Sequence, residues 1–180
     1  MRINPFEYPK SPNHVTRILL IIYLVTIVWV LLLKLGVHFS YMVERKINFI
    51  PFKEFFSSND QIDFPGLILN VIIFVPLGIY ISISYNKWSL IKKFVPILVI
   101  SLCIEILQYA LKIGAFDLTD VVTNTSGGML GLLIYKVIIK IVYHETKAQK
   151  LVNMIAIIGT VVIVSLLILL KLDLLPIHYR

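Results

Sequence analysis

Charged residues make up only 15% of this 180-residue chain, whereas soluble globular proteins contain about 25%. Hydrophobic residues make up 58%, and the mean hydropathy is +0.90. These values exclude an ordinary soluble domain and predict an integral membrane protein. Cysteine is nearly absent as well, because Cys103 is the single one. An intramolecular disulfide and a cysteine-based metal site are therefore both excluded.

Histidine is scarce and scattered. The four residues are His14, His38, His144 and His178, and they show no metal-ligand spacing. The sequence also shows no Ser/His/Asp or Cys/His arrangement and no glycine loop of the kind that cradles phosphates. Its net charge of +7 comes from Lys and Arg clustered between apolar runs. Such clusters are typical of loops that set membrane topology, so nucleic acid is not expected as a partner.

Apolar runs long enough to cross the ~30 Å hydrocarbon core of a bilayer alternate with polar segments. They predict an all-α fold, a polytopic transmembrane helix bundle of about five spans. The expected spans are residues 16–35, 66–85, 94–113, 120–142 and 151–170. Pro76 should kink the second span because it removes a backbone donor. The first run has no small-residue cleavage site after it, so we expect it to be retained rather than removed as a signal peptide.

The chain is expected to have three parts. Residues 1–15 hold three prolines and form an N-terminal cytoplasmic arm, residues 16–143 form a membrane domain of four spans, and residues 144–180 form the fifth span and a short C-terminal tail. Within the membrane domain, residues 36–65 are rich in Phe and form an aromatic outer loop on the membrane surface. Pro51 should keep the segment Asn48–Phe52 out of a helix.

Lys and Arg counts give the expected orientation. The arm and the loops at 86–93 and 140–150 together hold more Lys and Arg than the segments on the other side of the membrane. This bias predicts a multi-pass protein of the bacterial cell membrane with its N-terminus in the cytoplasm and its C-terminus outside. The aromatic loop and the turn at 114–119 would then lie outside.

Several polar residues fall where the composition predicts lipid, or directly beside it. They are Asn70, Glu105, Gln108, Asp117, Asp120 and Asn124. An ionisable residue in a transmembrane segment costs at least ~2.5 kcal/mol on insertion scales, so it marks a functional site by default. The expected topology places all of them near the outer surface, on helix faces that can meet. We therefore predict a polar cavity that opens outward.

Most of these residues also have a structural explanation. Interhelical hydrogen bonds would explain the amides of Asn70, Gln108 and Asn124. Thr119 or Asp120 would cap the fourth span, and Asp117 would be a turn carboxylate. The pair Gly127 and Gly131 forms a G-x-x-x-G pattern that permits close helix packing.

Glu105 is harder to explain structurally, because a buried carboxylate must be paired, protonated or bound to a metal. Lys112, Arg45 and Lys46 are the candidate charge partners. Glu105 is also the candidate acid or base if the protein is an enzyme, which the sequence leaves undecided. In that case Glu105, Asp117 and Asp120 are the candidate ligands of a divalent cation, since hard oxygen ligands suit Mg²⁺, Mn²⁺ or Ca²⁺. No other cofactor is expected.

Four motifs, taken together, resemble the VanZ-like membrane proteins. They are NFIPF at 48–52, N-x-x-x-F-x-P-x-G at 70–78, E-x-x-Q at 105–108 and F-D-x-x-D-x-x-x-N-x-x-G-G at 116–128. The resemblance covers residues 45–131 and places Arg45 and Asn48 with the other candidate binding residues. It implies a small polytopic bacterial membrane protein related to one that gives low-level resistance to the glycopeptide teicoplanin.

The leading hypothesis is that the cavity binds a lipid-linked wall precursor or a lipoglycopeptide, in contact with the lipid bilayer, and so contributes to teicoplanin-type resistance. One alternative is an enzyme that acts on an envelope lipid through the carboxylates and a metal. Another is a structural partner in a membrane complex, with the G-x-x-x-G face and the fifth span as its contact.

Overall fold

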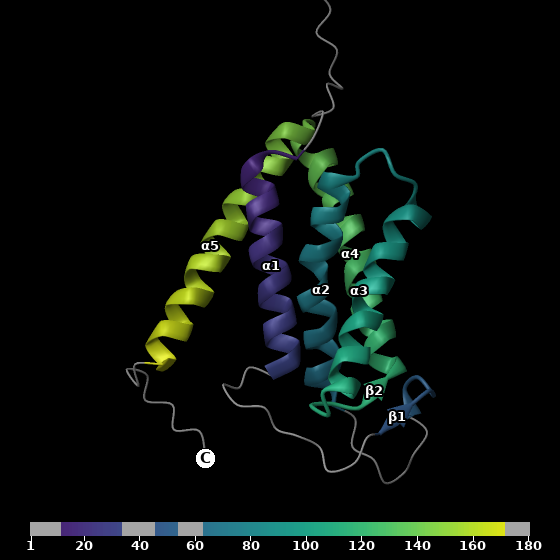
Figure 1. Cartoon of the computed structure of the whole chain (residues 1–180). Helices are drawn as coiled ribbons and strands as arrows, with labels where there is room; N and C mark the ends of the chain where they lie inside the picture. Colours follow the sequence, from purple (N-terminus) through teal and green to yellow (C-terminus); the bar gives the residue numbers. More distant parts are fainter. Residues whose placement is uncertain (1–11, 34–45, 54–62, 172–180) are drawn as a thin grey trace, which may run out of the picture.

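The computed structural model describes residues 12–33, 46–53 and 63–171. Five helices and one pair of short strands form this part of the chain (Figure 1). The helices are α1 (His14–Leu33), α2 (Phe64–Ser84), α3 (Leu90–Ala110), α4 (Leu118–Val142) and α5 (Glu145–Lys171), and the strands are β1 (Ile47–Asn48) and β2 (Phe116–Asp117). The predicted all-α helix bundle is confirmed, and each helix overlaps its expected span. The division into three parts stays a prediction.

The helices have the lengths and surfaces of a membrane protein. Among the described residues, α1, α2 and α4 are long and apolar enough to cross a bilayer, while α3 carries Lys92 and Lys93 in its first turn and contains Glu105. Large apolar side chains point away from the bundle on several helices; Ile72 and Ile106, for example, are more than half exposed. Such a surface suits lipid, because soluble proteins rarely expose extended apolar patches.

Close packing of α4 against α2 depends on glycine. A methyl group on Gly127 would collide with the backbone oxygen of Val71, and one on Gly131 would collide with that of Val75. Because both pairs advance by four residues, the two helices run parallel. The G-x-x-x-G pair therefore permits close helix packing, as predicted, and the helix that it packs against is α2. The structural-partner hypothesis requires this face of α4 to contact a second protein. The face is not available for that contact, because it packs against α2.

The third helix runs antiparallel to α4. Near its start, the side chain of Ile97 occupies the space that a methyl group on Gly128 would need. Toward its end, Oε2 of Glu105 accepts a hydrogen bond of 3.1 Å from the N–H of Asp117, the residue before α4. The start of α3 therefore packs against the middle of α4, and the end of α3 lies beside the start of α4. This antiparallel register determines how deep in the bundle the polar residues of the two helices lie.

Two apolar clusters form the core. The first cluster packs α1, α2, α3 and α4 together. It consists of Ile27, Phe74, Leu77, Ile81, Ile97, Ile104 and Leu132. The second joins α1, α2, α4 and α5 through Leu19, Tyr80, Ile83, Tyr135, Ala148 and Val152. The described candidate site residues belong to β1, β2, the second half of α3 and the first halves of α2 and α4. These parts of the chain meet at one end of the bundle (Figure 1), and α5 contributes to the packing farther from that end.

Candidate functional site

A short parallel strand pair joins residues 46–53 to the segment between α3 and α4. Ile47 pairs with Phe116, and Asn48 pairs with Asp117. Nδ2 of Asn48 donates to both carboxylate oxygens of Asp117, at 3.3 and 3.2 Å. Its Oδ1 accepts the N–H of Ile50 at 3.1 Å, which closes a local turn. The segment is not helical, which confirms the prediction made from Pro51.

Asp117 caps the amino end of α4. Its Oδ1 accepts the N–H of Thr119 at 2.7 Å, and the helix begins at Leu118. The capping role predicted for Thr119 or Asp120 is therefore wrong, because the helix starts earlier than the sequence suggested. Oγ1 of Thr119 instead accepts the N–H of Phe52 at 3.0 Å. Asp117 and Thr119 thus hold residues 46–53 at the start of the helix.

Asp120 lies in the first turn of α4 and binds a residue of another helix. Its Oδ1 accepts a hydrogen bond of 2.8 Å from Nδ2 of Asn70 on α2. The amino end of a helix carries partial positive charge, which favours a carboxylate in this position. Both side chains are half-buried. The interhelical bond expected for Asn70 is therefore present, and it holds Asp120 in place between α2 and α4.

Glu105 is the most deeply buried carboxylate among the described residues, with 2% of its surface exposed. The bond from the N–H of Asp117 supplies one of its contacts. Among its candidate partners, Lys46 and Lys112 are exposed, and in the described part of the chain neither forms an ion pair with it. Arg45, the third, lies outside the described residues.

Gln108 has a structural contact. Its Nε2 donates to the backbone oxygen of Leu31 at 3.0 Å, and 8% of its surface is exposed. Leu31 belongs to the last turn of α1, whose carbonyls lack partners within their own helix. Gln108 therefore ties the end of α1 to α3, in agreement with the structural explanation of this residue.

Two buried polar atoms lie one turn deeper than the carboxylates. Oγ of Ser101 and Oδ1 of Asn124 have no hydrogen-bond partner among the described residues, although the side chains are only 0% and 1% exposed. Ile97 contacts Gly128. Ser101 lies one turn after Ile97 on α3, and Asn124 lies one turn before Gly128 on the antiparallel α4, so Ser101 and Asn124 are at the same level of the bundle. Ser101 was not among the sequence candidates. Its position four residues before Glu105, on the same helix face, is the signal that points to it.

The carboxylates do not form a metal-binding group. Within residues 12–33, 46–53 and 63–171, no three His, Cys, Asp or Glu side chains lie close enough together to hold a metal ion. The proposed metal site at Glu105, Asp117 and Asp120 therefore stays a prediction without support from the geometry.

Apolar helices, with hydrogen-bonded polar residues gathered at one end, define a polytopic membrane protein. The model of the VanZ/LLP1 family matches residues 20–140. The chain is also similar to Protein VanZ of Enterococcus faecium, with 38% identity over 157 residues that cover 85% of this chain and 91% of that protein. The chain therefore belongs to the VanZ/LLP1 family of bacterial membrane proteins, which confirms the resemblance seen in its motifs. No solved structure matches it.

Proposed function

We propose that the polar cluster is an outward-facing site that binds the polar head of a lipid-linked envelope component or a lipoglycopeptide, and that the protein thereby contributes to teicoplanin-type resistance. The carrying observation is the convergence of Asn48, Asn70, Glu105 and Asp120, from β1, α2, α3 and α4, at one end of the bundle. Membership of the VanZ/LLP1 family supports the link to glycopeptide resistance.

The side chains of the cluster favour particular ligand groups. Carboxyl oxygens accept hydrogen bonds, so Glu105 and Asp120 suit amines, hydroxyls and amide N–H groups. Three exposed cations lie close in sequence to these elements: Lys46 precedes β1, Lys53 follows it, and Lys112 follows α3. They suit a phosphate group at the rim of the polar cluster. A head that carries both donors and phosphate, as in a lipid-linked precursor, fits this arrangement.

An outward orientation is supported by the charge at the opposite end. Among the described residues, that end holds the cations Arg17, Lys87, Lys92, Lys93, Lys136, Lys140, Lys147 and Lys150, with Glu145 as its carboxylate. Burial lowers the pKa of Lys93, and repulsion from Lys136 adds to this effect. By the positive-inside rule, the cationic end faces the cytoplasm and the polar cluster faces outward.

Binding is a better explanation than catalysis on the present geometry. An enzyme that acts on an envelope lipid through a cation needs several oxygen ligands in one group, and the described residues hold no group of three His, Cys, Asp or Glu side chains that could bind a metal ion. The binding hypothesis needs only the hydrogen-bonding groups that the cluster already brings together.

Drug susceptibility tests this proposal. Cells that express Glu105→Gln or Asp120→Asn should lose protection against teicoplanin, because each change replaces one acceptor oxygen of a carboxyl group in the cluster by an NH₂ donor. Asp63→Asn is the matched control: Asp63 is an exposed carboxylate at the same end that caps α2, and Asn caps equally well. If both cluster variants reach wild-type membrane levels and still protect fully, the cluster is structural and the proposal fails.

A further inference from the structure

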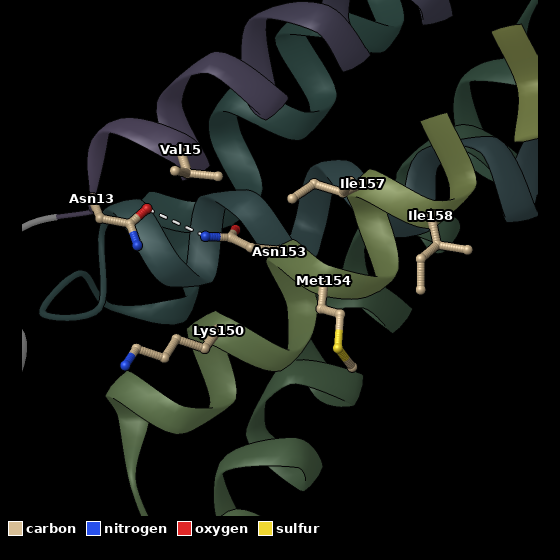
Figure 2. Close-up of a pocket in the computed structure, with 7 residues that line it drawn as sticks. All are labelled: Asn13, Val15, Lys150, Asn153, Met154, Ile157 and Ile158. Atoms are coloured by element: carbon tan, nitrogen blue, oxygen red, sulfur yellow. Dashed lines mark hydrogen bonds between the residues drawn. The ribbon is translucent and has the colours of Figure 1, made fainter. Parts of the chain in front are cut away.

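A groove of about 330 Å³ lies between the amino end of α1 and the first half of α5 (Figure 2). The start of α1 and the start of α5 lie at the end of the bundle opposite β1 and β2 (Figure 1). Its polar lining consists of Asn13, Lys150 and Asn153, and its apolar lining includes Val15 and Ile157. None of these residues belongs to the polar cluster, so the groove is a separate feature of the molecule.

A hydrogen-bonded network holds the two helices together beside the groove. Oγ1 of Thr16, which is fully buried, accepts from Nε2 of Gln149 at 2.8 Å and from Nδ2 of Asn153 at 2.9 Å. Oδ1 of Asn13 caps α1 by accepting the N–H of Thr16 at 2.8 Å, and it also accepts from Nδ2 of Asn153 at 3.2 Å (Figure 2). Because these bonds cross from α1 to α5, the groove is formed before any ligand arrives.

The walls change from polar to apolar along α5. Lys150 is exposed and lies one turn before Met154. Met154, Ile157 and Ile158 line the groove beyond it, and each is about half exposed. Residues spaced by three and four fall on one side of a helix. One side of α5 therefore presents a cation at the membrane surface, followed by an apolar track into the membrane.

We propose that this groove binds an anionic phospholipid of the membrane, with its phosphate at Lys150 and Asn13 and an acyl chain along Met154 and Ile157. Charge complementarity favours this occupant, because the described residues at this end are strongly cationic with Glu145 as their carboxylate. Basic pockets between membrane helices on the cytoplasmic side recognise anionic headgroups in this way. In Figure 2 the side-chain nitrogens of Asn13 and Lys150 lie at the same side of the groove.

Native mass spectrometry tests the proposal. The full chain is reconstituted in nanodiscs of equal parts phosphatidylglycerol and phosphatidylcholine, and the lipids that stay bound after release are counted. The wild type should retain phosphatidylglycerol preferentially. Lys150→Gln should lower that preference by on the order of five-fold, since one cation near the membrane surface contributes about 1 kcal/mol. Lys150→Arg should restore it.

Lys147→Gln is the matched control, because Lys147 is an exposed cation one turn away that does not line the groove. It should leave the preference nearly unchanged. Ile157→Trp should fill the groove and reduce the retention of both lipids. Equal effects of the two Lys variants would show general surface attraction and overturn the proposal. Undiminished retention in Ile157→Trp, or a dimer that excludes lipid, would overturn it as well. None of these results depends on the polar cluster.

Discussion

Asn70 donates a hydrogen bond of 2.8 Å to Asp120 and so joins α2 to the first turn of α4. It lies beside the place where the backbone of Val71 meets Gly127, so close backbone packing and a polar bond act at one junction. The bond orients a half-buried carboxylate at the end of the bundle that holds β1 and β2. We regard this junction as the frame of the proposed binding site.

The first prediction concerns this bond. Asn70→Ala should lower the free energy of unfolding by about 1 kcal/mol, the usual scale for an interhelical hydrogen bond in a membrane protein. A double-mutant cycle with Asp120→Ala, measured by thermal unfolding of purified protein in detergent, should give a coupling energy of similar size. Strictly additive effects would mean that the bond does not contribute to stability.

A second prediction uses two glycines under the same substitution. Gly131→Ala should destabilise the protein by about 2 kcal/mol, because the new methyl group would collide with the backbone of α2 and overpacking of this kind is costly. Gly159→Ala, where nothing lies within 4 Å of the new group, should be neutral or stabilising because Ala favours a helix. Thermal unfolding of the two variants measures both effects. Equal losses would contradict the close contact between α2 and α4.

Ser101 supplies a third prediction. Because its hydroxyl is buried without a partner among the described residues, Ser101→Ala should leave stability unchanged or raise it by up to about 1 kcal/mol. The same variant should weaken ligand binding if Oγ contacts the ligand one turn below Glu105. Thermal unfolding and binding are measured on one preparation. A clear loss of stability would show that the hydroxyl serves the fold.

Membrane orientation gives a fourth prediction. In a Cys103→Ser background, Lys112→Cys should react with a membrane-impermeant maleimide on intact cells, whereas Lys147→Cys should react only after permeabilisation. Both lysines are exposed and lie at opposite ends of the bundle. The reverse pattern would place the polar cluster in the cytoplasm and exclude an outward-facing site.

Periodicity and hydropathy were sufficient to predict the helical bundle, because each apolar run must satisfy its own backbone in lipid. The sequence also identified the polar residues that meet at one end. It misplaced the cap of α4, because both Asp117 and Asp120 are good capping residues and only the actual start of the helix distinguishes them. Ser101 escaped notice because one hydroxyl in an apolar helix is common, and its significance depends on its level relative to Asn124.

The contact made by Gly127 and Gly131 was also beyond the sequence. A G-x-x-x-G pattern shows that some helix can approach closely, but it does not name the partner. The structure shows that the partner is α2, through the backbone of Val71 and Val75. The face of α4 that holds Gly127 and Gly131 is therefore covered by α2 of the same chain, whereas the sequence alone allowed a second protein in its place.

Equilibrium binding of a fluorescently labelled lipid-linked wall precursor and, in parallel, of labelled teicoplanin to the purified protein in nanodiscs tests the proposed site most directly. We predict saturable binding of at least one of them to the wild type and to Asp63→Asn, and binding at least ten-fold weaker to Glu105→Gln, a loss of at least about 1.4 kcal/mol. Thermal unfolding confirms that the variants are folded. Wild-type affinity in a folded Glu105→Gln protein would contradict a binding role for the buried carboxylate.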